Sequence, residues 1–133
     1  MMDNGLIQVN SDFDAATTGD RLVACLAERR LKLFARINHA ANAAAVDQAL
    51  RPTELFIFGN PAVGTPLMQC RSSVAIDLPQ KMLIWQDARE QVWLTYNDPR
   101  YLMSRHDLAG CAAVIERLSQ VLQDIATTAT QGA

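Results

Sequence analysis

Hydrophobic and polar positions alternate with a period of two in several parts of the chain, which is the pattern of strands buried on one face. Near the start, Ile7, Val9, Ser11 and Phe13 alternate with polar residues. The other segments that alternate, or that are apolar on both faces, are 31–39, 55–58, 81–86 and 92–96. Because the connection 87–90 is short and polar, the segments 81–86 and 92–96 are predicted to form a hairpin. The pattern predicts about five strands.

A helical period of about 3.6 residues marks two longer segments. The first runs from about Ala15 to Arg29, with Asp12 and Asp14 before it as candidate N-caps. The second starts at Leu108 and carries an apolar stripe for about five turns. Shorter helices are predicted at 40–50, 66–70 and 101–105. The tail, about 127–133, is small and polar, and we expect it to fray.

The order of these segments is strand, helix, strand, short helix, strand, short helices, hairpin and long helix. A chain of 133 residues is most simply one domain, here 1–133. We predict an α+β fold of two layers, with an antiparallel sheet of about five strands and two longer helices on one face.

Two tryptophans have the parity opposite to the residues that we place in the core. If the core side of the hairpin is formed by Met82, Ile84, Val92, Leu94 and Tyr96, then Trp85 and Trp93 face outward. An exposed tryptophan pair on a sheet is a natural subunit interface, so we expect a homodimer.

Charge and composition exclude several partners. The formal net charge is -2 and the pI is about 5.6, so neither nucleic acid nor an anionic membrane is expected to bind. No apolar run approaches the roughly 20 residues of a membrane span, and the first residues lack the features of a secretory signal. We expect a cytoplasmic protein. The cysteines Cys25, Cys70 and Cys111 form no C-x-x-C pair and are expected to be reduced thiols.

The stretch from Thr53 to Pro79 holds a strand, a turn at Asn60 and a short helix that begins behind Thr65-Pro66. Thr65 is the expected N-cap. The free N–H groups of this helix could receive a carboxylate or phosphate, or Thr65 could satisfy them itself. The spacing of Gly59 and Gly64 resembles a phosphate loop, but the lysine of a P-loop is missing.

Polar residues at strand and helix ends supply the candidate site. His39 continues the apolar face of its strand, so we expect its imidazole at the core or at the rim of a pocket; the alternative is a structural histidine. The ligand-binding candidates are His39, Asn60, Thr65, Tyr96, Asn97 and His106. His39, His106 and Met68 are candidate ligands of a soft metal or haem iron, although Met68 also fits a core position. No particular cofactor is indicated.

Four segments resemble the domain-of-unknown-function family 302: FARINHAANA, ELFIFGNPAVGTPLMQ, AIDLPQKMLIW and VWLTYNDPRYLMSRH. The resemblance implies an α+β fold similar to the TATA-box-binding protein, with the order βαββββα, and a homodimer. It implies no established activity. Arg30 stands where the family commonly has glycine, which weakens the expectation of a left-handed helix end there.

Three functions fit these observations. The first hypothesis is a homodimer that binds a small ligand, metal or cofactor at a pocket near His39 and the turn 60–69. The second is an interaction or scaffold dimer. The third, an enzyme with His39 or His106 as general base and Cys70 as nucleophile, is the least favoured, because no aspartate lies in a catalytic motif.

Overall fold

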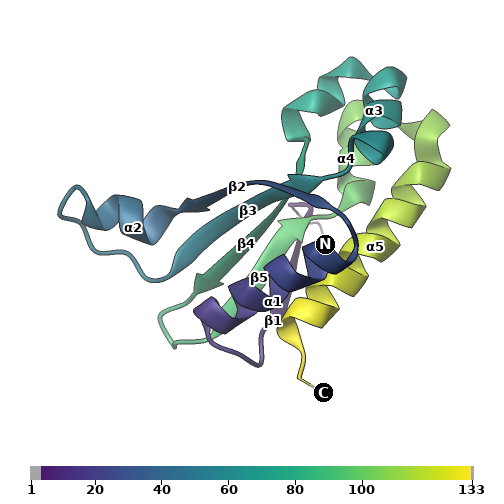
Figure 1. Ribbon diagram of the computed structural model, residues 1–133. Coiled ribbons are helices and arrows are strands. Elements are labelled where there is room, and N and C mark those ends of the chain that lie inside the picture. The colour runs from purple at the N-terminus through teal and green to yellow at the C-terminus, as the bar shows by residue number, and fades with distance from the viewer. Residues whose placement is uncertain (1–3, 133) are drawn as a thin grey trace.

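The computed structural model describes residues 4–132, which form a sheet of five antiparallel strands with helices across one face (Figure 1). The strand order is β1-β5-β4-β3-β2. The strands are β1 Leu6–Asn10, β2 Lys32–Asn38, β3 Thr53–Gly59, β4 Gln80–Gln86 and β5 Val92–Asn97. The α-helices are α1 Ala15–Glu28, α2 His39–Ala44, α3 Pro61–Cys70, α4 Pro99–His106 and α5 Ala112–Thr130; short 3-10 helices are η1 Ser72–Asp77 and η2 Ala109–Cys111. The predicted α+β class and element order are confirmed.

The core lies between the sheet and the pair α1 and α5. On the sheet side Phe56, Met82 and Leu94 are fully buried, and from the helices Leu22 and Ile125 are fully buried against them. Burying a side chain of this size contributes about 1.5–3 kcal/mol, so this layer of contacts holds the two long helices on the sheet. None of the helices formed by residues 4–132 is both long and apolar enough to cross a membrane.

The tryptophan parity expected from the sequence is confirmed. Met82, Ile84, Val92, Leu94 and Tyr96 are buried under the helices. Trp85 and Trp93 pair across β4 and β5 on the other side of the sheet, with ring centroids 6.5 Å apart. We call that side the open face; its apolar residues include Ile37, Leu55, Ile57, Leu83, Trp85 and Trp93.

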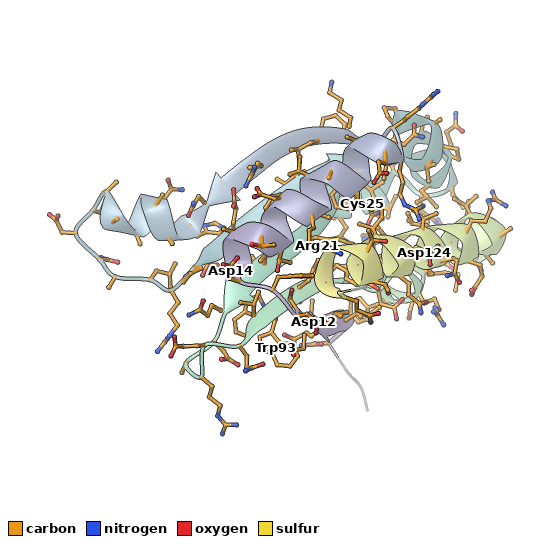
Figure 2. The ribbon with its side chains drawn as sticks, turned by 60° about the horizontal axis from the view of Figure 1, so that its bottom comes forward. Asp12, Asp14, Arg21, Cys25, Trp93 and Asp124 are labelled. Carbon is orange, nitrogen blue, oxygen red and sulfur yellow. The ribbon has the colours of Figure 1, made fainter. Side chains whose placement is uncertain are left out.

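The C-terminal segment is anchored, so the expectation of a frayed tail from 127 is wrong for residues up to 132. Arg21 of α1 donates from Nη2 to the carbonyl oxygens of Thr128 and Gln131 at 2.8 and 2.9 Å. The amide of Gly132 donates to Asp12 Oδ2 at 2.8 Å. Figure 2 shows Arg21 and Asp12 beside the last turns of α5. Small polar residues still form ordered helix here because α1 satisfies the carbonyls at its end.

The helix expected behind Thr65 starts a full turn earlier. Asn60 is the N-cap of α3, and its side-chain oxygen accepts from the Ala62 amide at 2.9 Å. Pro61 follows at the first helical position, where its missing N–H costs nothing. Thr65 is therefore inside the helix and caps nothing, which corrects the predicted cap.

The first helix does end in left-handed geometry, although the residue is not glycine. Arg30 has φ 58°, and the amides of Arg30 and Leu31 donate to carbonyls of the last turn at 3.0 and 2.9 Å. These bonds keep an arginine where glycine is favoured, at a cost of about 1–2 kcal/mol of backbone strain.

The connection between β2 and β3 projects from the body of the molecule, and we call residues 39–52 the arm. Figure 1 shows α2 extended away from the helical layer. No residue of α2 is buried, and Val46 and Leu50 are exposed. The Asn38 side chain caps α2 by accepting from the Ala41 amide at 2.9 Å. The arm therefore has few contacts with the rest of the fold.

Candidate functional site: an apolar cavity between α3, β4 and α5

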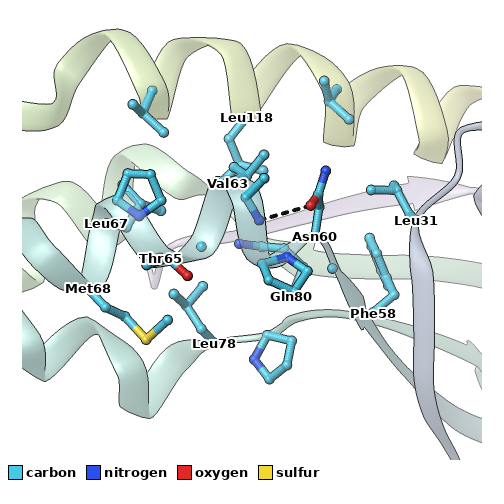
Figure 3. Close-up of a pocket in the computed structure, with 18 of the residues that line it drawn as sticks. Leu31, Phe58, Asn60, Val63, Thr65, Leu67, Met68, Leu78, Gln80 and Leu118 are labelled. Atoms are coloured by element: carbon cyan, nitrogen blue, oxygen red, sulfur yellow. Dashed lines mark hydrogen bonds between the residues drawn. The ribbon is translucent and has the colours of Figure 1, made fainter.

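A cavity of about 590 Å³ opens between α3, the start of β4 and the first half of α5 (Figure 3). Its size is within the range of pockets that hold small molecules. The walls are mostly apolar, and the lining residues that matter below are Asn60, Thr65, Met68, Gln80, Arg117 and Leu118. The cavity exists because α3 covers the end of the sheet at a distance from α5, and side chains such as Leu67 and Leu118 fill only part of the space between them.

Gln80 is the unusual residue of this cavity. It is the first residue of β4, only 9% exposed, and its side chain lies among the apolar walls (Figure 3). Within residues 4–132 its side-chain amide has no hydrogen-bond partner. The polar atoms of Gln80 are not sealed from solvent, so water or a bound molecule in the cavity can form hydrogen bonds with this amide.

Arg117 is the charged residue among the described residues that line the cavity. It is exposed on α5, so it lies at the solvent edge of the cavity. In the described structure it forms no ion pair, and no aspartate or glutamate is among the lining residues. The apolar space therefore has one cationic edge, which is the charge pattern that an amphipathic anion would complement.

Of the residues predicted from sequence, Asn60, Thr65 and Met68 line this cavity. The side-chain oxygen of Asn60 is used in the cap of α3, which leaves its amide nitrogen available. The hydroxyl of Thr65 makes no hydrogen bond in the described part of the chain. These three residues come together because α3 carries them on one face of the cavity.

The structure does not bring His39 to that cavity. His39 follows Asn38, which pairs with Glu54 at the start of β3, whereas Asn60 follows Gly59 at the other end of that strand. The length of the strand separates them by roughly 20 Å. His39 is also exposed, because the strand ends one residue earlier and His39 begins α2. The expectation that its imidazole points toward the core or the rim of this pocket is therefore wrong.

Tyr96 and Asn97 lie on β5, two strands from β3, and neither lines the cavity. Tyr96 is 5% exposed and belongs to the core under the helices. Burial raises the pKa of its phenol above the ordinary value of 10.0, and the nearby Asp98 charge adds to the effect. Its role in the structure is packing between β1 and β4.

His106 ends α4 in a separate cluster. Its Nε2 is 2.6 Å from Asp77 Oδ2, and its Nδ1 is 2.9 Å from Ser73 Oγ. Asp77 also pairs with Arg105 at 3.3 Å. The His106 ring is only 6% exposed and both of its nitrogens have partners, so the ring joins α4 to η1 and has no free nitrogen for a metal.

The proposed metal ligands His39, His106 and Met68 are thus in three different places. Among residues 4–132, no group of three or more histidine, cysteine, aspartate or glutamate side chains is arranged to hold a metal ion. The cavity itself is lined mostly by apolar side chains, with a few polar groups among them.

Sequence reasoning missed the residues that make the cavity. Leu118, Val121 and Leu122 belong to the apolar stripe of α5, which indicates burial but not whether the stripe meets sheet or empty space. Gln80 could have been noticed, because it is a polar residue at the core parity of β4, the same side as Met82.

Two packed layers and one apolar cavity at the end of the sheet define a small α+β domain with a potential binding site. The model of the DUF302 family, described as a domain of unknown function, matches residues 7–125. The chain therefore belongs to the DUF302 family, as its four sequence segments suggested. The crystal structure of an uncharacterized conserved protein DUF302 from Bacillus stearothermophilus has the same fold, with a TM-score of 0.85 at 12% identity, covering 96% of this chain and 99% of that one.

The curated relatives that match this chain include proteins named fluoride-specific ion channels. The chain is 43% identical over 108 residues to the Fluoride-specific ion channel FluC 1 of Brucella suis biovar 1 (strain 1330), covering 81% of this chain and 42% of the relative. The FluC 1 protein of Brucella abortus biovar 1 (strain 9-941) matches with the same identity, over 81% of this chain and 40% of the relative. The chain spans about two fifths of the length of these relatives.

Proposed function

We propose that the protein binds a small, mostly apolar carboxylic acid in the cavity between α3, β4 and α5. The observation that carries this proposal is the side-chain amide of Gln80, which lines a mostly apolar cavity and makes no hydrogen bond with the described residues. A carboxylate or carbonyl oxygen would accept from it. Arg117 at the edge supplies the positive charge that favours an acid over a neutral molecule.

Decanoate and 1-decanol test this proposal because they share an alkyl chain and differ in charge. We expect saturating decanoate to raise the melting temperature by mass action, and decanol to raise it less. The variant Gln80→Leu keeps the volume and removes the amide, so decanoate should bind about tenfold more weakly. Arg117→Met should weaken decanoate binding and leave decanol binding unchanged.

The control variant is Val121→Trp, which fills the cavity from α5 and should abolish binding of both molecules. Circular dichroism and the melting temperature of each unliganded variant establish that it is folded. If decanoate produces no shift, or if it binds Val121→Trp as well as the wild type, the cavity does not take this class of ligand.

We further propose that the protein is a homodimer in which a second copy covers the open face. This face is apolar across β3, β4 and β5, whereas a sheet face that meets water normally carries polar residues. Lys81 is the one charged residue that these three strands place on it. Absence of charge at the centre and a stacked tryptophan pair are typical of an interface core.

A second candidate function follows from the curated relatives. A segment 43% identical to this chain is part of proteins named fluoride-specific ion channels, and about three fifths of their length lies outside the match. We propose that the domain acts as an accessory module of such a channel. Deleting the matched segment from the Brucella suis protein should lower fluoride tolerance of cells, and co-expression of this chain should restore it. Unchanged tolerance after the deletion would contradict the proposal.

A further inference from the structure

Two cysteines that are distant in sequence end neighbouring elements. Cys70 is the last residue of α3 and Cys111 is the last residue of η2, directly before α5. Both side chains are half-buried, so a small oxidant can reach them, whereas Cys25 is only 4% exposed in the core. The function proposed above uses neither of them.

The two segments that carry these cysteines are held side by side by contacts along their length. Arg71 Nη2 donates to Asp107 Oδ2 at 2.8 Å. A Cβ atom placed on Gly110 would lie 3.8 Å from Cys70 Sγ. Cys111 Sγ lies 4.0 Å from the carbonyl oxygen of Pro66. These three contacts place both thiols where the end of α3 meets η2 and the start of α5.

The thiols also interact with one another. The neighbouring Cys70 thiol, with a smaller contribution from burial, raises the pKa of Cys111 above its ordinary value of 9.0. Cys111 is therefore protonated at neutral pH and suits the role of the second sulfur, which reacts only after the first has been oxidised.

We propose that Cys70 and Cys111 form a reversible disulfide, produced by hydrogen peroxide, that ties the end of α3 to the start of α5. The Cys70 thiolate attacks one peroxide oxygen, the O–O bond breaks, and the departing hydroxide takes a proton to become water. Cys111 sulfur then attacks the sulfenic sulfur, loses its proton and releases a second water. Two thiols are oxidised and one peroxide is reduced.

The bridge would fix one wall of the cavity relative to another. Leu67 and Met68 of α3 line the cavity, and so do Val114 and Leu118 of α5. The cysteines join these two walls at one end. Oxidation therefore restrains any movement of α3 relative to α5, and a dithiol such as dithiothreitol reverses the effect.

The test treats the full chain with a small excess of hydrogen peroxide and counts thiols after unfolding. The chain has three thiols, and we expect each chain to lose two of them without forming a link to another chain. Peptide mapping under non-reducing conditions should find a Cys70–Cys111 link. The melting temperature should rise by roughly 10 °C and return after dithiothreitol. Hydrogen exchange in α3 should slow in the oxidised protein.

Matched variants separate this pair from general oxidation. Cys25→Ser should behave as the wild type, because Cys25 lies in the core away from the junction. Cys70→Ser and Cys111→Ser should each lose the peroxide-induced rise in melting temperature. A wild-type protein that forms only sulfinic acid, or only links between chains, overturns the proposal. Peptide mapping of the wild type decides the result even if a variant does not fold.

Discussion

At the scale of single residues, hydrogen bonds from neighbouring groups hold two residues in left-handed backbone conformations that are normally unfavourable. Arg30 occupies left-handed backbone at φ 58°, and Asp107 does the same at φ 56° at the end of α4. Sequence reasoning could locate the first helix but could not predict this geometry at Arg30, because the two amides that fix it bond to carbonyls whose positions depend on where the helix ends. The left-handed residue is set by the hydrogen bonds and not by the side chain.

Arg30→Gly should stabilise the protein by about 0.5–1 kcal/mol, because relief of left-handed strain exceeds the entropy that glycine loses on folding. Urea unfolding followed by circular dichroism measures the change. Arg29→Gly is the matched control, since Arg29 has φ -86° and no strain to relieve. If both variants lose stability equally, the geometry at Arg30 costs nothing.

Asp87 gives a prediction about pH. The Trp93 indole N–H, then the Gln91 amide, hold the pKa of its carboxyl below the ordinary value of 3.8. A lowered pKa contributes stability that is present above the unfolded value and is lost as pH falls through the folded value, below 3.8. Asp87→Asn should therefore be less stable than wild type at pH 7, and the two should converge as pH falls below about 4.

Thermal unfolding across that pH range measures the convergence. Glu90→Gln is the control in the same turn, because the Glu90 side chain makes no hydrogen bond in the described structure. A gap between Asp87→Asn and wild type that stays constant from pH 7 to pH 3 would show that the carboxylate is not involved.

At the scale of elements, periodicity predicted which segments fold and what they bury. The alternation of β4 and β5 placed Trp85 and Trp93 on the open face, and the stripe of α5 placed Leu118 and Ile125 inward. Periodicity failed at the ends of elements. The sequence predicts that Thr65 caps a helix starting at Pro66, whereas the helix begins at Pro61. It also predicts that the last turns of α5 fray, whereas they are helical to Thr130. Both ends are decided by hydrogen bonds to single side chains, which a period does not contain.

The anchoring of α5 by Arg21 gives a prediction for that element. Arg21→Met should lower the free energy of unfolding by about 1 kcal/mol, because two bonds from a charged donor are lost while the buried Nε, which has no partner, no longer needs desolvation. Hydrogen exchange should accelerate in the last turn of α5.

The matched control is Arg29→Met, which also removes an arginine of the first helical segment. Arg29 has only an exposed ion pair with Asp124 at 3.9 Å, so its loss should change stability by less than about 0.5 kcal/mol. Equal effects of the two substitutions would mean that the Arg21 bonds do not hold the end of α5.

At the scale of the whole molecule, the two faces of the sheet differ in what covers them. Helices bury one face and the open face stays apolar. The candidate site was only partly predictable at this scale: Asn60, Thr65 and Met68 are neighbours in one helix, so sequence placed them together. His39 was assigned to the same site because parity gives the direction of a side chain and not the end of the sheet at which it lies.

The proposed dimer predicts that Trp85→Glu is a monomer, because a carboxylate at the centre of the open face would be buried without a partner. Light scattering coupled to size-exclusion chromatography measures the mass. Ile76→Glu is the control, since Ile76 is an apolar residue 74% exposed on η1, away from the sheet. If Trp85→Glu remains a dimer, the interface lies elsewhere. If the wild type is a monomer, the proposed dimer does not exist.

The arm has a consequence for how this domain can be varied. Residues 39–52 have little burial, and both ends of the arm are fixed by the pairing of β2 with β3. Additional length between Ala45 and Arg51 would cost only loop entropy, which grows slowly with the number of residues. The tip of the arm is therefore where a fluorescent or affinity tag can be inserted with least disturbance of the cavity, since the two lie at opposite ends of the sheet.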